Sequence, residues 1–430
     1  MRPGMTTHLF ALLLGACGFG LAPNVDKGSS DDDDGPSGFN LCGAPDPELR
    51  AAGTWRDPIE ASTFPFMDRG DTSLSEELDG ETWDCGQIPR GGAEVVYKLR
   101  VPEGAALRAE LRQDEGATLT MQFTNARPSG GEVTGCTDVA DSVLEVAAPE
   151  AGTWYLVVDT PTPDGTGRPG PYTLLVDLVQ AGEWQERDFG AGVTWSRLGG
   201  PGALGRQSFN LFAIDTATQR VRPRPHYDCQ TVPARIAELT GPRIGVALAA
   251  SDESCNAGNF AGGAEFFRMD GETLRVNNYA DPARAVGWSD GEEAETRSLL
   301  RGADWTEVAN GFAGFPALVS GGNVALDPPG TDALYTERRA RTAAGVNARG
   351  ELLIFTADGP HARAEGLTLQ ELAQVMVDAG AHDAVNLGGA GTVTAWASGC
   401  GFDGIVNWPL DGGGSTRDGA RPVQAGLYVF

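Results

Sequence analysis

The stretch from Gly366 to Thr392 constrains the fold most, because it predicts a helix, a strand and a glycine-rich bend in direct succession. Thr368 and Glu371 form a capping box, in which each side chain satisfies a backbone N–H of the first helical turn. Apolar residues then recur at helical spacing, at Leu369, Leu372, Ala373 and Met376. Gly380 can adopt the left-handed conformation that ends the helix.

The second half of this stretch carries few side chains. Ala384–Leu387 is a short apolar run typical of a strand, and Gly388–Gly391 follows it directly. A loop of this composition lets a ligand approach the backbone closely. A tight turn between two packed elements is the alternative, and the composition alone does not decide between them.

Further motifs lie on both sides in a fixed order. Arg341-Thr342-Ala343 leads into two predicted strands with a turn at 348–350, and the second strand ends at Asp358-Gly359. After the bend come Val406-Asn407-Trp408-Pro409 and Arg421-Pro422-Val423. In this order and spacing the motifs resemble the phosphodiester glycosidase family, which includes N-acetylglucosamine-1-phosphodiester α-N-acetylglucosaminidase. The resemblance is clear over the last third of the chain and looser from about residue 184.

The chain departs from the family pattern at two places. The family has Asp-Gly-Gly-Gly-Ser after the strand, whereas this chain has Gly388-Gly389-Ala390-Gly391-Thr392, without the acidic residue. A literal copy begins at Asp411, in the loop between the last two motifs, and we interpret it as a surface turn; a shifted register that restores the motif is the alternative. An earlier family strand ends in Asn-Gly-Gly-Phe-Phe, and here Asp252 and Glu253 follow that strand instead.

Glycoside cleavage commonly uses two carboxyl groups, one to protonate the leaving oxygen and one to support the cationic sugar. Asp358 is a catalytic candidate on this resemblance, and it can also be a turn-forming residue before Gly359. Asp252 and Glu253 are further acid–base candidates, and solvated loop charges are the alternative. Arg341 is the expected phosphate clamp, since its planar fork donates two hydrogen bonds, although a salt bridge on a strand is the alternative. The other expected substrate-binding residues are Thr342, Asn386, Gly388, Gly389, Gly391 and Thr392.

An all-β segment precedes this region. Six short alternating or β-branched runs between residues 93 and 178 are separated by glycine and proline, which predicts a β-sandwich. Ala151–Asp159 and Gly170–Leu174 resemble the bacterial pre-peptidase C-terminal domain, a family credited with adhesion or targeting and sometimes with calcium. Asp159 and Asp164 are candidates for such a calcium site or are turn carboxylates; no other cofactor is expected.

The N-terminus reads as an export signal. Residues 1–16 combine Arg2 with a short apolar run, and Leu14-Gly15-Ala16-Cys17 resembles a bacterial lipoprotein box, which implies lipidation of Cys17. An ordinary signal peptide is the alternative. An acidic linker over residues 17–40 contains four consecutive aspartates and is expected to stay extended.

The remaining six cysteines are an even number, which favours disulfides in an exported chain. We expect Cys85 to pair with Cys136 and leave the other pairings open. Their spacing contains no zinc motif, so no metal site is predicted from them. The net charge of −27 argues against nucleic-acid binding through the overall field of the protein.

The predicted fold is therefore multidomain, with an all-β sandwich over residues 41–181 and a mixed α+β domain over residues 182–430. Its few helices are expected after Cys229, around Asp290–Leu300 and after Gly366. We expect an exported hydrolase of sugar 1-phosphodiesters, with activity weakened by the substituted bend. The alternative is a non-catalytic surface lipoprotein that binds a glycan or an anionic polymer. The sequence does not specify the sugar, the leaving group, metal dependence or oligomeric state.

Overall fold

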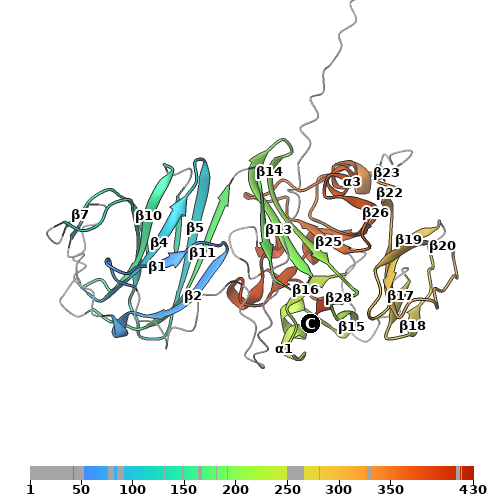
Figure 1. Ribbon diagram of the computed structural model, residues 1–430, viewed down its shortest axis with the longest axis horizontal. Coiled ribbons are helices and arrows are strands. Elements are labelled where there is room, and N and C mark those ends of the chain that lie inside the picture. Colours follow the sequence, from blue (N-terminus) through green and yellow to red (C-terminus); the bar gives the residue numbers. More distant parts are fainter. Residues whose placement is uncertain are drawn as a thin grey trace, which may run out of the picture. The chain divides into compact units, whose positions relative to one another are not determined.

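The computed structural model describes residues 42, 53–75, 82–84, 92–129, 132–146, 150–162, 167–180, 182–190, 192–248, 266–279, 281–326, 332–412, 417 and 419–430. Over these residues the chain is mostly β-structure arranged in several sheets (Figure 1). None of their helices is both long and apolar enough to span a bilayer. The predicted fold class, a β-sandwich followed by a mixed α+β region, is confirmed.

Two sheets form the sandwich. The first has the order β1 (Ile59–Ala61), β4 (Glu94–Val101), β10 (Gly152–Asp159), β6 (Thr120–Thr124), β8 (Cys136–Ala140). The second has the order β2 (Phe66–Asp71), β11 (Pro171–Gln180), β5 (Ala105–Gln113), β9 (Val143–Val146). Alternate side chains from both sheets meet in one apolar core, in which Phe123 and Trp154 stack with ring centres 4.6 Å apart. A short parallel pair, β3 (Thr82–Trp83) and β7 (Glu132–Val133), and the 3-10 turn η2 (Thr72–Leu74) complete this part.

An eight-stranded sheet organises the remainder, and β13, β14 and β25 run side by side in it (Figure 1). Its order is β12 (Trp184–Asp188), β13 (Val193–Gly202), β14 (Gly205–Ile214), β25 (Leu352–Ala357), β24 (Arg341–Asn347), β26 (Ala381–Gly389), β22 (Ala317–Ser320), β23 (Asn323–Val324). We call its two sides the helix face and the inter-sheet face. On the helix face, α3 (Leu369–Asp378) packs with α2 (Ala333–Thr336).

A second sheet covers the inter-sheet face. Its order is β15 (Val221–Gln230), β28 (Val423–Val429), β16 (Ile244–Ala247), β27 (Ala395–Ala397), and its apolar side chains share a core with the eight-stranded sheet. A third sheet has the order β18 (Glu272–Arg275), β17 (Phe267–Met269), β21 (Asn310–Gly314), β19 (Ala283–Trp288), β20 (Glu295–Leu299). The remaining elements are α1 (Val232–Ala237), η4 (Ala390–Thr392), η5 (Phe402–Gly404) and η6 (Leu410–Gly412).

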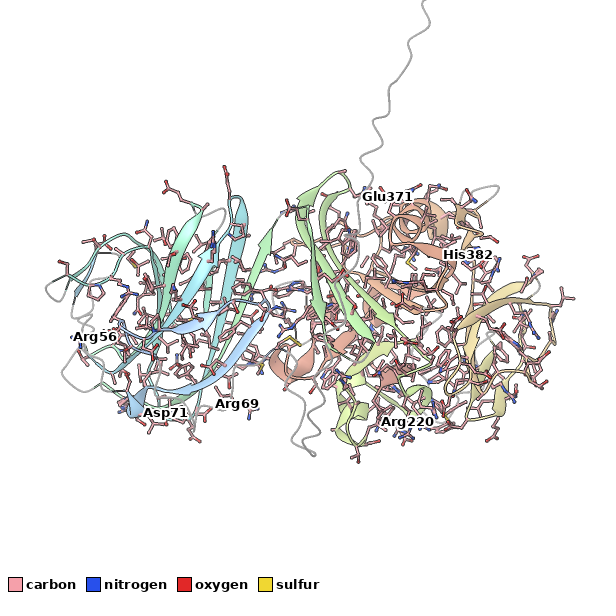
Figure 2. All side chains as sticks on the ribbon, viewed as in Figure 1. Arg56, Arg69, Asp71, Arg220, Glu371 and His382 are labelled. Atoms are coloured by element: carbon pink, nitrogen blue, oxygen red, sulfur yellow. A yellow bond between two sulfur atoms is a disulfide. The ribbon has the colours of Figure 1, made fainter. Side chains whose placement is uncertain are left out.

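Two of the three predicted helices are confirmed. Helix α1 follows Cys229, and α3 begins with the predicted capping box, with Glu371 at its first turn (Figure 2). The helix predicted around Asp290–Leu300 is wrong, because Glu295–Leu299 forms β20 and pairs antiparallel with β19. Glu, Arg and Leu are good helix formers, but intrinsic helix propensity is small and pairing with a neighbouring strand overrides it.

One disulfide joins Cys42 to Cys400, a pair that the sequence left open. Cys136 is disulfide-bonded, whereas Cys85 lies outside the described residues, so their pairing stays a prediction. Cys17 and Asp164 also lie outside the described residues. The expected domain boundaries and the likeness to a pre-peptidase C-terminal domain stay predictions as well.

Candidate functional site

The strand register brings three of the sequence motifs together at one end of the central strands of the eight-stranded sheet. Arg341, at the start of β24, is opposite Ala357, at the end of β25, and opposite Gly389, at the end of β26. Asp358 follows β25 directly and its backbone N–H donates to the carbonyl of Ser208 on β14. The expected clamp, the expected carboxyl and the glycine bend thus begin from neighbouring backbone positions.

Arg341 nevertheless turns its side chain to the helix face. It is 1% exposed, and its guanidinium donates to the backbone carbonyls of Leu334 at 2.8 Å, Glu337 at 3.0 Å and Leu367 at 3.0 Å. These carbonyls belong to α2 and to the segment that leads into α3. This geometry ties two elements to the sheet and does not favour the phosphate-clamp role, which stays untested.

Neighbouring residues cover the glycine bend, so it is not an open binding surface. Gly388 and Gly389 belong to β26, and the Thr392 hydroxyl donates to the Gly389 carbonyl at 2.7 Å. A Cβ added at Gly391 would lie 2.3 Å from Cζ of Arg421, so this guanidinium covers the bend. Arg421 in turn holds Asp411, with bonds of 2.9 and 2.7 Å. An anion can reach the backbone of the bend only if the Arg421 side chain moves.

Two other expected substrate-binding residues support the strands. Asn386 is 3% exposed and its side-chain amide donates to the carbonyl of Phe315 at 3.0 Å. Thr342 is 2% exposed and lies opposite Gly388 in the β24–β26 pair. Asp252 and Glu253 lie outside the described residues, so their roles stay predictions.

Asp358 lies on the inter-sheet face at the centre of a hydrogen-bond cluster. Its carboxylate accepts from the Ser208 hydroxyl at 2.5 Å, from the Asn407 side-chain amide at 2.8 Å and from the backbone N–H of Trp408 at 3.0 Å. Asn407 also accepts from the Ala395 N–H and donates to the Val393 carbonyl. The Val406–Pro409 motif is therefore fastened to the end of β25 through Asp358.

Burial changes the acidity of this carboxyl group. Asp358 is 1% exposed, and desolvation raises its pKa above the ordinary value of an aspartic acid. The hydrogen bonds from Ser208, Asn407 and Trp408 and the nearby His361 act in the opposite direction but do not cancel the effect of burial. A carboxyl group with a raised pKa is the kind that enzymes use as a proton donor.

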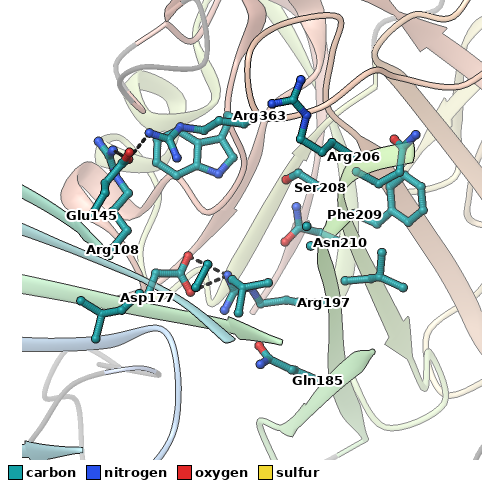
Figure 3. A pocket seen from close by; sticks show the side chains of 18 of the residues that line it. Arg108, Glu145, Asp177, Gln185, Arg197, Arg206, Ser208, Phe209, Asn210 and Arg363 are labelled. Atoms are coloured by element: carbon teal, nitrogen blue, oxygen red, sulfur yellow. Dashed lines mark hydrogen bonds and ion pairs between the residues drawn. The ribbon is translucent and has the colours of Figure 1, made fainter. Parts of the chain in front are cut away.

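A pocket of about 450 Å³ lies next to this cluster (Figure 3). Ser208 and Trp408, which both bond to Asp358, line it, while Asp358 lies one hydrogen bond behind the wall. Residues of β5, β9 and β11 of the sandwich and of β13 and β14 form much of the remaining wall. Its charged lining side chains are Arg108, Glu145, Asp177, Arg197, Arg206 and Arg363.

The two carboxylates in the pocket wall are ion-paired. Asp177 bonds to Arg197 at 2.8 Å and to Arg417 at 2.9 Å, and Glu145 bonds to Arg108 and Arg363. Burial alone would raise the pKa of Asp177, but its two guanidiniums together hold that pKa below the usual value. The pKa of Glu145 is likewise lowered by Arg363 and Arg108 against the effect of burial. The pKa of Asp358 is therefore shifted upwards, whereas the pKa values of Asp177 and Glu145 are shifted downwards.

Sequence reasoning did not single out several residues of this pocket. Arg206 and Ser208 lie on β14 and Arg363 lies in the turn after β25, and none of them belongs to a motif of the sequence. Only the Val-Asn-Trp-Pro motif gave a signal, because it named Asn407 and Trp408 without assigning them a role. The sandwich residues Arg108 and Glu145 could be found only from the folded chain.

Comparisons with known proteins found similar solved structures and one family model. No curated protein matches the chain. The catalytic domain of zebrafish N-acetylglucosamine-1-phosphodiester α-N-acetylglucosaminidase, solved with an inhibitory pro-peptide, is similar at 15% identity and a TM-score of 0.43, over 57% of this chain and 83% of that one. A Burkholderia pseudomallei protein described as exported is similar at 13% identity and a TM-score of 0.40, over 81% and 98%. A hypothetical Synechocystis protein is similar at 12% identity and a TM-score of 0.39, over 80% and 78%.

Structural likenesses at this level carry no argument about activity. The model of one family, described as phosphodiester glycosidase, does match the chain directly, over residues 248–430. This range contains Asp358, Asn407 and Trp408, whereas Ser208 and the sandwich precede it. The C-terminal part of the chain is therefore similar to the phosphodiester glycosidase family over these residues.

Proposed function

We propose that the chain hydrolyses a sugar 1-phosphodiester in the pocket beside Asp358. The observation that carries this proposal is the Ser208–Asp358 hydrogen bond of 2.5 Å, which connects a buried carboxyl of raised pKa to a hydroxyl in the pocket wall. The match of residues 248–430 to the phosphodiester glycosidase family supports the choice of reaction.

The proposed chemistry moves one proton through two side chains. In the reactive state the Asp358 carboxyl is protonated and donates to Ser208, so the direction of this hydrogen bond is reversed and the Ser208 hydroxyl turns to the leaving oxygen. As the bond between the anomeric carbon and that oxygen breaks, Ser208 gives its proton to the oxygen and takes the proton of Asp358. Water then attacks the anomeric carbon, and the proton that it releases returns the carboxyl to its starting state.

The phosphate is bound by arginines of the pocket rather than by Arg341. Arg206 and Arg363 both line the pocket, and their planar forks suit the oxygens of a phosphodiester. Within the part of the chain that the structure describes, no ion pair involves the Arg206 side chain. Its charge is therefore available to a ligand.

We also propose that the chain acts outside the cytoplasm. The signal-like residues 1–16 and the lipobox at Cys17 support export, with or without a lipid anchor. The Cys42–Cys400 disulfide supports an oxidising compartment.

The test is hydrolysis of a panel of sugar 1-phosphodiesters by the purified chain, with its disulfides intact. We expect slow turnover of at least one member. Because the acid must be protonated, kcat/KM should fall as the pH rises through the raised pKa of Asp358. Release of the free sugar at equal rates by Asp358→Asn and the parent chain would contradict the proposal.

A non-catalytic glycan-binding protein is the second candidate. It is favoured by one observation, which is that Asp358 lies behind the pocket wall and not in it. If no member of the panel is cleaved while sugar phosphates still bind in the pocket, this second function replaces the first.

A further inference from the structure

We propose that the sandwich side of the pocket binds a hydrocarbon chain. The ligand would then be a sugar 1-phosphodiester in which an apolar alcohol is esterified to the phosphate. This inference rests on the proposed function and deepens it by naming the class of that alcohol. Its test measures binding and needs no turnover.

The charged side chains that the sandwich contributes to the pocket are already paired. Arg108 forms ion pairs with Glu110 and Glu145, and Asp177 forms one with Arg197. The other sandwich residues in the lining are aliphatic residues and a glycine: Gly104, Ala106, Leu107, Val146 and Val179. Among the described residues of this wall, every side chain that can hydrogen-bond is therefore held by an ion pair, and the surface left for a ligand is apolar.

An aliphatic pair lies in this apolar surface. Val179 on β11 and Ala106 on β5 are directly opposite each other. Their neighbours Leu178 and Leu107 are buried in the core of the sandwich. Because successive residues of a strand point to opposite faces, Val179 and Ala106 point away from that core. Ala106 is exposed and Val179 is half-buried, so both can contact a ligand in the pocket.

The aliphatic pair lies next to the proposed proton donor. Ser208 on β14 is directly opposite Gly199 on β13. A Cβ added at Gly199 would lie 2.6 Å from a methyl carbon of Val179, so Val179 packs directly on this glycine. Paired strands are about 4.8 Å apart, so one strand spacing separates Ser208 from the residue that Val179 covers. A group esterified to a phosphate beside Ser208 therefore reaches the aliphatic pair within a few bonds.

An apolar chain suits this surface better than a second sugar. The hydroxyl groups of a sugar would lose water on contact with Val179 and Ala106 and would find no free partner among the described side chains of this wall, which costs free energy. A hydrocarbon chain gains free energy from the same contact, because apolar surface on both sides is removed from water. Leu198 and Ala362 also line the pocket and extend the apolar surface beyond the sandwich.

The probes for the test are the methyl and hexyl esters of glucose 1-C-phosphonate. Both carry one negative charge and neither can be hydrolysed at the anomeric carbon, so calorimetry measures binding alone. The methyl ester gives the contribution of the sugar and the phosphonate. We expect the hexyl ester to bind about 20-fold more tightly, which corresponds to partial burial of its additional methylene groups.

Two substitutions that change the side-chain shape little place a hydroxyl in the apolar surface. We expect Val179→Thr and Ala106→Ser each to lower the ratio of the two affinities to about 5-fold, while the affinity for the methyl ester changes by less than about 3-fold. Val143→Thr is the matched control, because Val143 lies on β9 of the same sheet, is 41% exposed and does not line the pocket. In this control the ratio should stay at about 20-fold.

Equal affinity for the two esters in the parent chain would overturn the inference, as would an equal loss for both esters in Val179→Thr and Ala106→Ser. Neither result touches the proposed hydrolysis, which the panel of diesters tests separately. Conversely, absence of turnover leaves the expected dependence of binding on chain length in place.

Discussion

Arg341 and Asp358 lie at neighbouring strand ends of the eight-stranded sheet, but one points to the helix face and the other to the inter-sheet face, and their roles differ. On the helix face, Arg341 donates to three backbone carbonyls and holds α2 and the start of α3. On the inter-sheet face, Asp358 collects hydrogen bonds from Ser208, Asn407 and Trp408 and borders a pocket. Successive residues of a strand point to opposite faces, so backbone neighbours can have unrelated roles. The difference separates a structural arginine from a candidate catalytic acid.

The largest expected effect is on catalysis. Ser208→Ala leaves the fold of β14 intact and removes the only hydroxyl proposed to pass a proton from Asp358 to the substrate. We expect kcat to fall by about 10²–10⁴-fold, the usual contribution of acid–base catalysis. Single-turnover rates on the best member of the sugar 1-phosphodiester panel would measure it. Unchanged rates would show that chemistry does not occur on the inter-sheet face.

Arg341→Ala should act on stability instead. It leaves three buried carbonyls without their charged donor, and we expect the free energy of unfolding to fall by about 3–5 kcal/mol in a denaturant titration. Arg339→Ala is the control, because the ion pair of Arg339 with Glu337 is partly exposed and contributes about 0–1 kcal/mol. Folded Arg341→Ala should bind glucose 1-phosphate like the parent chain. Loss of that binding without loss of stability would restore Arg341 as a clamp.

A buried histidine predicts a pH effect on the fold that is separate from the site. His226 bonds through its ring to Tyr428 and to the Gln230 carbonyl, and desolvation lowers its pKa from 6.5 to about 4. The unfolded chain therefore binds more protons between these values, so stability is complete above about pH 6.5 and falls as the pH drops toward 4. The loss should approach about 3 kcal/mol.

Denaturant titrations at several pH values would measure this effect. In His226→Gln the decline between pH 6.5 and 4 should be shallower by that amount. If the parent chain and His226→Gln lose the same stability between pH 6.5 and 4, other titratable groups cause the loss.

The smallest expected effects are losses of stability caused by alanine substitutions in the glycine bend. At Gly391 an added Cβ meets the end of the Arg421 side chain, which is 38% exposed and can move, so Gly391→Ala should cost less than about 1 kcal/mol. At Gly389 the added Cβ meets the backbone carbonyl of Ala340 at 2.4 Å, and we expect a cost of about 1–3 kcal/mol. Thermal unfolding of the two variants would show which substitution costs more stability. A large loss of turnover in stable Gly391→Ala would make the bend part of the site.

Much of the fold could be predicted from the sequence because its patterns are local. Thr368 and Glu371 lie within one helical turn, so their capping box identified α3 directly. The segment 295–299 was predicted wrongly because its pairing partner, β19, lies outside any local pattern. The partner of Cys400 could not be predicted either, since Cys42 is 358 residues away.

The candidate site was harder to predict for the same reason. The motif order placed Asp358, Arg341 and the bend at one edge of a sheet, but it did not give the face to which each side chain points. Ser208 is 150 residues from Asp358, and Glu145 is 218 residues from Arg363, to which it bonds. Contacts of this range depend on the packing of whole sheets.

The most direct test is a crystal structure of the chain with a non-hydrolysable sugar 1-phosphonate. We expect the phosphonate to lie in the pocket, bonded to Arg206 or Arg363, with the bridging carbon that replaces the leaving oxygen next to the Ser208 hydroxyl. A phosphonate that instead lies on the backbone of Gly389–Thr392, with Arg421 displaced from Asp411 and the pocket unoccupied, would contradict this expectation.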